Sequence, residues 1–547
     1  MKEPEKNDDY AMVNISGYLR KNATLFPDKP ALLHPVCLTY KELEKEVDRY
    51  SYGLERAGIR SGTRTLLLIP AGPEMLFITF ALFRISAVPV MIDPGMGIGA
   101  MLKAIEGVSA EAFIGIPKAH LLRKIRPSVF RNVKICLSTG KCWLPDVKRI
   151  SKFLEAGSRN YPFLKEDPSR MAAIFFTSGS TGPAKGVVYT AGMLNHQVKV
   201  TKDQFNIRSD ETDLCTFPLL GLFAICHGSS SVMADMDMVH PAKINPARVI
   251  RNIEDWGCTQ MFGSPMILTR LSQFCSEKGI KLSTLRNVIS AGAPVYTKIL
   301  KDFSRLLGKE ARVYTPYGAT EALPVTNISS SELLELSEMD VEDNGLCIGY
   351  PIQGLDVRII QISDDQISSW TDNILMPAGQ VGEIAVKGPW VSTEYYNNAE
   401  VNRLSKIPDP GNNCIWHRMG DLGRADEKGR LWFYGRKSQR VITEAGTLFT
   451  IPCEAVFNRH PAVRRTALVG LPIGNILMKR PVICVQLKPD HHPSLEIREE
   501  LLKIGKSHRL TEQISDFVFF RSFPVDPRHN AKIFREKLAV QAAGSIK

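Results

Sequence analysis

Residues 171–189 read Met171-Ala-Ala-Ile-Phe-Phe-Thr-Ser-Gly-Ser-Thr-Gly-Pro-Ala-Lys-Gly-Val-Val-Tyr189, two apolar stretches joined by a loop of glycines, serines and threonines. Glycines allow backbone N–H groups to turn inward, hydroxyl groups add donors, and Lys185 adds positive charge, which together suit a polyphosphate. The loop lacks the G-x-x-x-x-G-K-S/T spacing of a Walker A loop, and a strand follows it. A serine, glycine and threonine run alone is more often an ordinary loop, but the two flanking strands favour a phosphate-binding loop.

Strands and helices alternate on both sides of this loop. Such alternation indicates parallel sheets built from βαβ units. From residue 345 to 391 the strands become shorter and are separated by Gly and Pro turns, which predicts a mostly antiparallel, barrel-like subdomain. The expected strands of the α/β part are 65–69, 88–92, 259–262, 287–290 and 311–314, and its first expected helices are 43–54 and 74–83.

A second boundary falls near residues 435–440. The last 110 or so residues have their own alternation of helices and strands, which is enough for a small α+β domain. The sequence therefore predicts an α/β protein with a large N-terminal domain over 1–435 and a small C-terminal domain over 436–547. The helices expected in the small domain are 452–458, 495–504 and one from near 531, and the expected strands are 464–469, 481–487 and 517–520.

Composition excludes several classes of protein. The 547 residues are 44% hydrophobic and 23% charged, which rules out a disordered chain or a small disulfide scaffold. Eleven cysteines without a Cys-x-x-Cys pair indicate free, mostly buried thiols. The first nine residues have no apolar signal-peptide core, and charged residues and prolines interrupt the most apolar stretch, 66–101, before the about 18 residues needed to span a bilayer. We expect a cytoplasmic protein without an integral membrane segment.

The net charge of +12 favours anionic ligands. The densest basic stretch, residues 121–126, is short and resembles one face of a helix. No motif for DNA or RNA recognition occurs, so a nucleic-acid partner is not expected.

A second motif, Tyr314-Thr-Pro-Tyr-Gly-Ala-Thr-Glu321, follows an apolar strand. It should therefore lie at the carboxyl end of that strand, where open α/β sheets bind ligands. Tyr317 suits stacking on a flat base, Thr320 suits a phosphate, and Glu321 suits Mg²⁺ held against phosphate oxygens. Taken alone, the motif fits a turn with a solvated glutamate equally well.

A third motif joins Asp421, in His417-Arg-Met-Gly-Asp421, to Arg436 fifteen residues later. An aspartate after glycine is often only a turn former. It can also accept hydrogen bonds from both hydroxyls of a ribose, and an arginine at this distance could reach the same sugar.

These three motifs, in this order, resemble those of the AMP-forming adenylating enzymes, which include acyl-CoA synthetases, peptide-synthetase adenylation domains and firefly luciferase. The resemblance runs from about Asn14 to about Ala543. It implies a mobile C-terminal domain, ATP and Mg²⁺ as cofactors, and a hinge at Ser438. It also implies a catalytic Lys532 that bridges the substrate carboxylate and the α-phosphate, beside catalytic roles for Lys185, Thr320 and Glu321, the last as the metal ligand.

The resemblance further assigns the residues that hold the nucleotide. Gly292, Ala293 and Pro294 match the segment that lies along the adenine, with Tyr317 on the other face of the base. Asp421 and Arg436 match the residues that hold the ribose. The phosphate-binding residues are Thr177, Ser178, Gly179, Thr181, Gly182 and Lys185, and Gly318 and Thr320 complete the nucleotide site.

The sequence departs from the family at three places. Ser438 stands where Asp or Lys is usual, Thr443-Glu-Ala-Gly446 stands where many acyl-CoA synthetases have Lys-x-x-Gly, and Asn530-Ala531 stands where Ser-Gly is common. These positions serve the second half-reaction more than the first. They weaken the expectation of a coenzyme A step.

Several stretches, among them 216–223, 315–324, 460–470 and 523–538, resemble the β-lactone synthetases of bacterial long-chain olefin biosynthesis. That resemblance implies ATP-dependent adenylation of a 2-alkyl-3-hydroxyalkanoic acid and closure to a β-lactone, with release of AMP and pyrophosphate. It also implies an assembly with other olefin-pathway enzymes. We expect the acyl group to contact Phe217, Leu219, Phe223, Phe262, Gly263 and Met266, although these apolar residues fit an ordinary core equally well.

Two other functions compete with this one. A long-chain fatty acid–CoA ligase would use the same adenylation and then an external thiol. A non-catalytic nucleotide-binding or lipid-binding protein of the same fold would not need intact Lys185, Glu321 and Lys532. A serine hydrolase is excluded because no Gly-x-Ser-x-Gly motif occurs.

Overall fold

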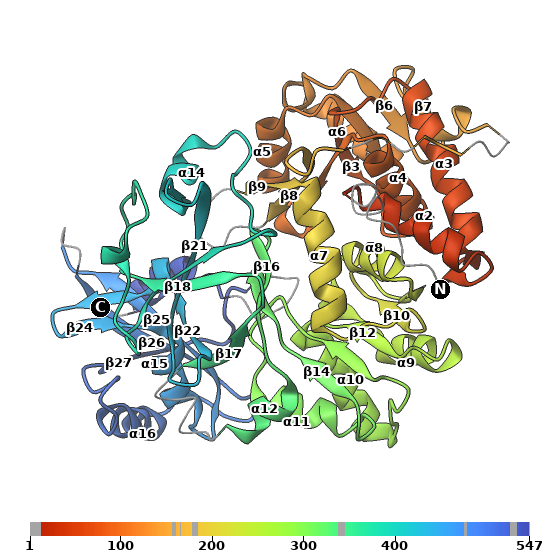
Figure 1. Cartoon of the computed structure of the whole chain (residues 1–547). Helices are drawn as coiled ribbons and strands as arrows, with labels where there is room; N and C mark the ends of the chain where they lie inside the picture. Colours follow the sequence, from red (N-terminus) through yellow and green to blue (C-terminus); the bar gives the residue numbers. More distant parts are fainter. Residues whose placement is uncertain are drawn as a thin grey trace.

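The computed structural model describes residues 13–155, 160–162, 164, 166–177, 184–336, 345–474, 478–525 and 533–545. Two seven-stranded sheets form the α/β part of the chain, and a third, largely antiparallel sheet joins them to a smaller C-terminal domain (Figure 1). The predicted α/β fold with parallel sheets is confirmed. None of the helices among the described residues is both long and apolar enough to cross a membrane.

The first sheet has the strand order β7-β6-β5-β3-β4-β8-β9 and is parallel except for the β8–β9 pair. The strands buried at its centre are rich in Val, Leu, Ile and Phe, as expected for strands covered on both faces. Its strands are β3 (Arg64–Leu68), β4 (Val88–Ile92), β5 (Ala112–Gly115), β6 (Ile135–Ser138), β7 (Lys148–Arg149), β8 (Met171–Thr177) and β9 (Lys185–Thr190), and its helical segments include α3 (Tyr40–Arg56), α4 (Pro73–Arg84), α5 (Ile98–Val108), α6 (Pro117–Ile125) and the 3₁₀ turn η2 (Pro127–Phe130).

The second sheet has the order β14-β13-β12-β10-β11-β1-β2 and is parallel apart from the β1–β2 hairpin. Its strands are β1 (Pro30–His34), β2 (Leu38–Thr39), β10 (Thr212–Cys215), β11 (Ser230–Met233), β12 (Gln260–Phe262), β13 (Asn287–Ile289) and β14 (Arg312–Tyr314). The helices around it are α2 (Ser16–Leu25), α7 (Ala191–Gln204), α8 (Pro218–His227), α9 (Pro246–Asp255), α10 (Pro265–Lys278) and α11 (Thr297–Ser304).

Local sequence explains how these helices begin. Thr39 and Glu42 form a reciprocal capping box at the start of α3, and proline occupies the first turn of α4, α6, α8, α9 and α10. Leu43, Val47 and Leu54 lie on one face of α3 and are fully buried. The helices predicted at 43–54 and 74–83 and the five predicted strands are all present, with ends shifted by a few residues.

The third sheet has eight strands and the main order β15-β16-β17-β22-β21-β19-β18, with β20 paired to β21. Its paired strands are antiparallel, as predicted, but within the described residues no pair closes it into a barrel. The strands are β15 (Tyr317–Ala319), β16 (Ala322–Asn327), β17 (Leu346–Pro351), β18 (Asp356–Ile360), β19 (Gly382–Lys387), β20 (Lys406–Asp409), β21 (Cys414–Ala425) and β22 (Leu431–Arg436), and the associated helices are α12 (Ser330–Glu335) and α14 (Ala399–Ser405).

The C-terminal domain packs helices against the three-stranded sheet β25-β26-β27 beside a small β23–β24 hairpin. The predicted helices and strands of this domain are confirmed, and the last helix begins at Arg535. The strands are β23 (Val441–Thr443), β24 (Gly446–Leu448), β25 (Val463–Pro472), β26 (Lys479–Leu487) and β27 (Asp516–Phe519), and the helices are α15 (Thr450–Asn458), α16 (Leu495–Lys506) and α17 (Arg535–Ser545).

Candidate active site

Residues expected to bind the nucleotide and the acyl group follow neighbouring strands of the second sheet. Phe217 follows β10, Phe262 ends β12, Gly292 lies three residues after β13, and Tyr317 lies three residues after β14. Strands β10, β12, β13 and β14 are adjacent and parallel, so their carboxyl ends share one edge of the sheet. The fold therefore brings residues from four distant segments to one edge.

Two glycines of the expected adenine site have conformational roles. Gly292, beside Ala293 and Pro294, has φ +91°, a left-handed conformation that residues with a Cβ rarely adopt. At Gly318 a Cβ would lie 2.6 Å from the carbonyl oxygen of Ala322, because strands β15 and β16 form a tight hairpin there. Both glycines allow the backbone to take shapes that a side chain would prevent.

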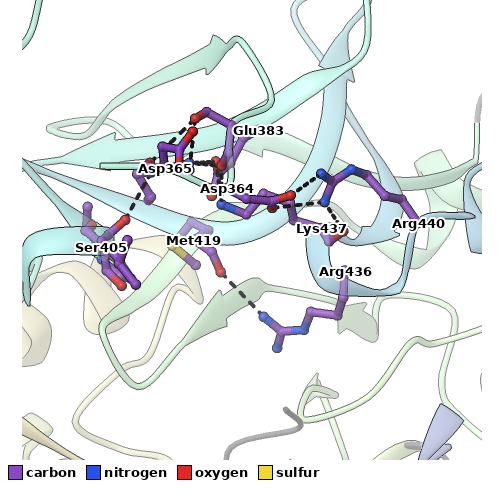
Figure 2. Close-up of polar contacts among 12 residues, drawn as sticks. Asp364, Asp365, Glu383, Ser405, Met419, Arg436, Lys437 and Arg440 are labelled. Carbon is purple, nitrogen blue, oxygen red and sulfur yellow. Dashed lines mark hydrogen bonds and ion pairs between the residues drawn. The ribbon is translucent and has the colours of Figure 1, made fainter. Parts of the chain in front are cut away.

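Tyr317, Asp421 and Arg436 form a cluster in which Asp421 is buried and the other two residues are partly exposed. The Tyr317 hydroxyl donates to Asp421 Oδ2 at 2.6 Å, and Arg436 Nη1 lies 3.0 Å from Asp421 Oδ1. Asp421 and Arg436 face each other in register on β21 and β22, and Arg436 also donates to the Met419 carbonyl (Figure 2). Burial raises the pKa of Asp421, while Arg436 and the hydrogen bond from Tyr317 oppose that shift.

The cluster has the chemistry needed for a ribose. Asp421 is 2% exposed, and its Oδ1 accepts no well-aligned hydrogen bond from the described residues although Arg436 is close. A buried carboxylate oxygen without a donor is costly, and a sugar hydroxyl is a suitable donor. The predicted partnership of Asp421 and Arg436 is consistent with this geometry.

Replacing Asp421 by Asn should weaken ATP binding by about 10- to 100-fold, because a charge-assisted hydrogen bond contributes about 1.5–3 kcal/mol. Isothermal titration with ATP would measure the change. Asp426→Asn is the matched control, since Asp426 lies on the same hairpin but bonds Trp432 and Arg430. If both variants bind ATP like the parent protein, Asp421 has no part in the nucleotide site.

The strands that flank the expected phosphate loop end opposite each other. Thr177 ends β8 and Lys185 begins β9, and these two residues are partners in the β8–β9 register. The structure thus confirms two strands joined by a short connection. Of the residues predicted to bind phosphate or to act on it, Ser178, Gly179, Thr181, Gly182 and Lys532 lie outside the described residues.

Tyr395 connects the two parts of the expected phosphate site. Its hydroxyl donates to Glu321 Oε1 at 2.6 Å, and the Lys185 ammonium lies 5.6 Å from the centre of its ring. The backbone of the Glu321 turn is also held, because Tyr189 donates to the Thr320 carbonyl and the Ser392 N–H donates to the Glu321 carbonyl. Sequence analysis missed Tyr395, since 74 residues separate it from Glu321 and no local spacing links them.

Lys406 and His417 lie next to the Tyr395 ring. They face each other in register on β20 and β21, and both are buried. Lys406 donates to the Ser392 carbonyl and lies 5.0 Å from the centre of the Tyr395 ring. Burial lowers the pKa of Lys406 to about 7, with Glu321 opposing the shift, and burial also lowers the pKa of His417. The Glu321 carboxylate is therefore close enough to Lys406 to favour its charged form.

Tyr395→Phe should lower kcat/KM by about 10-fold or more at limiting Mg²⁺, because it removes a hydrogen bond to a charged group. High Mg²⁺ should restore part of the loss. In calorimetry, the variant should lose more affinity for Mg·ATP than for metal-free ATP, each compared with the parent protein. Tyr396→Phe is the control, since the Tyr396 ring lies against Arg64 instead. Equal effects of the two substitutions would contradict a specific role for Tyr395.

The chemistry of Glu321 fits a metal that arrives with the nucleotide. The described residues contain no group of three or more His, Cys, Asp or Glu side chains that could hold a metal ion. Mg²⁺ commonly binds through one or two carboxylates together with substrate phosphates. Glu321, held by Tyr395 and facing the Lys185 side of the site, could be such a single carboxylate.

The predicted hinge residue Ser438 lies between Lys437 and Arg440. Both of these basic residues form ion pairs with acidic residues of the large N-terminal part of the chain. It belongs to the 3₁₀ turn Lys437–Gln439. Lys437 Nζ lies 3.2 Å from the buried Glu383, which also binds Arg418, and Arg440 pairs with Asp364 (Figure 2). Burial lowers the pKa of Lys437, and Glu383 opposes that shift.

Ser438→Pro should lower turnover more than it lowers ATP affinity, because proline removes rotation about φ at the expected pivot. Steady-state kinetics and ATP titration would separate the two effects. Ser438→Ala keeps the rotation and serves as the control. Equal loss of turnover and affinity in the proline variant would place the hinge elsewhere.

The residues expected to contact the acyl group fall into two environments. Phe217 and Phe262 are partly exposed and their ring centres are 6.3 Å apart at the sheet edge, with Met266 partly exposed nearby in sequence. Phe223 is buried in the main hydrophobic core, and Leu219 packs against that core. A Cβ at Gly263 would meet Leu268 Cδ1 at 2.5 Å, so a larger residue here would require the Leu268 side chain to move.

Comparison with known proteins follows from this geometry. A family model described as AMP-binding enzyme matches residues 19–396. The chain belongs to the AMP-binding enzyme family. It is 38% identical, over 97% of its length and 98% of theirs, to the olefin beta-lactone synthetases of Xanthomonas campestris and Stenotrophomonas maltophilia. The fold of this family member also resembles that of O-succinylbenzoate coenzyme A synthetase from Bacillus subtilis in complex with ATP and magnesium, with a TM-score of 0.75 and 19% identity over 95% of this chain and 98% of that one.

Proposed function

We propose that this protein is an ATP-dependent ligase that adenylates a long-chain 2-alkyl-3-hydroxyalkanoic acid and closes it to a β-lactone, with release of AMP and pyrophosphate. The observation that carries the proposal is the 38% identity to olefin beta-lactone synthetases along nearly the whole chain. The Tyr317–Asp421–Arg436 cluster and the Lys185–Tyr395–Glu321 arrangement support the adenylation step.

In the first step, a carboxylate oxygen of the acid attacks the α-phosphorus of ATP. The new P–O bond forms as the bond to the β-phosphate breaks, and pyrophosphate leaves. Lys185 and Lys532 would stabilise the negative charge that develops on the phosphates. Mg²⁺, held by Glu321 and the phosphate oxygens, would supply further neutralisation of charge.

In the second step, the β-hydroxyl oxygen of the same substrate attacks the carbonyl carbon of the acyl-AMP. The C–O bond of the lactone forms, AMP leaves with the electron pair of the mixed anhydride, and the hydroxyl proton is released. Because the nucleophile belongs to the substrate, its effective concentration at the carbonyl is high. The four-membered ring is strained, so the mixed anhydride of the acyl-AMP must supply the driving force.

The fatty acid–CoA ligase alternative is less well supported. Thr443 stands at the position where many acyl-CoA synthetases begin Lys-x-x-Gly. Its hydroxyl oxygen lies 2.7 Å from Gln513 Oε1 and 2.8 Å from the Gly446 carbonyl oxygen, within hydrogen-bond distance of both, in a tight hairpin. Glu444, next to it, is exposed and acidic, which does not favour the phosphates of coenzyme A. The decisive experiment is the release of AMP without coenzyme A.

A further inference from the structure

Basic residues gather at the β7 edge of the first sheet. Residues 116–154 contain ten Lys or Arg and one acidic residue, Asp146, which gives a net +9 of the +12 of the whole chain. In the sequence these charges are spread over α6, β7, the 3₁₀ turn η3 (Ile150–Lys152) and the connections between α6 and β7. The fold collects them, because β7 pairs with β6 at the sheet edge and His120 on α6 hydrogen-bonds the Leu137 carbonyl on β6 at 2.8 Å.

Large apolar side chains are exposed in the same segments. Trp143 is 81% exposed, Ile125 63% and Leu121 46%. Leu121 and Ile125 are one turn apart on α6, so they share a face. Trp143 lies in the β6–β7 connection, and Asp146 of that connection pairs with Arg123 at 2.6 Å and Lys124 at 3.1 Å on α6.

The connection that carries Trp143 is held in place by apolar residues that pack into the protein. Leu144 and Val147 are buried in a small apolar cluster with Cys136, and Cys142 packs against it. The residues on both sides of Trp143 therefore point into the protein while the indole points outward. An exposed tryptophan on an anchored connection, with exposed aliphatic and basic side chains in the neighbouring segments, is typical of an interaction surface.

We propose that this surface, defined by Lys118, Leu121, Ile125, Lys141, Trp143 and Arg149, binds the face of an anionic lipid membrane. Basic residues attract acidic headgroups, and Trp with aliphatic side chains inserts at the boundary between headgroups and acyl chains. A nucleic acid would use the positive charge but not the aliphatic side chains. Charge complementarity together with the exposed Trp143 therefore favours a lipid surface.

The position of the surface in the fold is compatible with this role. Strands β6 and β7 lie at the end of the molecule remote from the C-terminal domain (Figure 1). A membrane at that end would leave the C-terminal domain free of contact with lipid. The inference goes beyond the proposed reaction and rests on charge and exposure alone.

The test is co-sedimentation of the full chain with lipid vesicles. We expect binding to phosphatidylcholine vesicles that contain phosphatidylglycerol, little binding to phosphatidylcholine alone, and weaker binding as salt rises. The double variant Lys118→Glu/Lys141→Glu should bind at least about 25-fold less tightly, about fivefold for each basic residue that leaves the surface. The control Lys503→Glu/Lys506→Glu changes the net charge equally on exposed residues of α16 and should bind like the parent protein.

Trp143 provides an independent readout. Its emission, taken as the difference between the parent protein and Trp143→Phe, should shift to shorter wavelength when anionic vesicles are added. Trp143→Ser should weaken vesicle binding, and thermal unfolding monitored by circular dichroism checks that each variant is folded. Equal losses of vesicle binding in the Lys118/Lys141 and Lys503/Lys506 double variants would overturn the proposal, and so would the absence of a shift in Trp143 emission. So would binding to duplex DNA but not to vesicles, which would assign the surface to a polyanion.

Discussion

AMP should accumulate over many turnovers when the protein receives ATP, Mg²⁺ and a 2-alkyl-3-hydroxy acid in the absence of coenzyme A. An enzyme that forms thioesters stops at the acyl-AMP until the thiol arrives, so its release of AMP depends on coenzyme A. A lactone-forming enzyme carries its nucleophile in the substrate. The Thr443–Gln513 hydrogen bond and the exposed Glu444 beside it, where many thiol-accepting relatives have Lys-x-x-Gly, motivate this expectation.

The 3-deoxy acid is the matched control. It has the carboxylate needed for adenylation but no hydroxyl to close the ring, so it should give about one AMP per enzyme or less. The hydroxy acid should yield a product whose mass equals that of the acid minus water. Strict dependence of AMP release on coenzyme A with the hydroxy acid would establish the fatty acid–CoA ligase instead.

Lys532→Ala should slow acyl-AMP formation by about 10²- to 10³-fold, the usual effect of losing one group that stabilises transition-state charge. ATP affinity should change little, because the nucleotide contacts proposed for Tyr317, Asp421 and Arg436 remain. Pyrophosphate release in a single turnover measures the rate of acyl-AMP formation, and ATP titration measures the affinity for ATP.

Lys537→Ala is the control for this substitution. Lys537 is an exposed lysine at the start of α17, five residues further along the chain, and its ammonium lies over the Phe534 ring. It should release pyrophosphate at the parent rate. Normal pyrophosphate release by the Lys532 variant would mean that another group bridges the carboxylate and the α-phosphate.

Much of the fold could be predicted from the sequence because its signals are local. The apolar runs on either side of the glycine-rich loop correspond to β8 and β9, and the run before Tyr314 corresponds to β14. The contact between Asp421 and Arg436 also has a local cause. The two residues lie on the strands of one hairpin, which places them opposite each other. Short-range patterns determine both the strands and this contact.

The surroundings of Glu321 could not be predicted in the same way. Tyr395 reaches Glu321 because isolated bridges join its segment to distant parts of the chain, Val391 to Ala322 and Tyr395 to Val187. Lys406 and His417 meet through the register of β20 and β21, and nothing in their own sequence marks them as buried. The sheet also remains open where a barrel-like subdomain was expected, because strand composition does not specify whether the edge strands pair.

The two ion pairs around Ser438 differ in how easily they can be broken. Lys437 precedes the expected pivot and is bound to Glu383, whose side chain is 1% exposed, whereas Arg440 follows the pivot and is bound to Asp364, whose side chain is 62% exposed. Rotation at Ser438 would leave the Lys437–Glu383 pair intact and break the Arg440–Asp364 pair, which is open to solvent mainly on the aspartate side because the Arg440 side chain is 12% exposed. A change of orientation would then exchange the Arg440–Asp364 pair for water while Lys437 keeps its partner and holds the preceding turn to the third sheet.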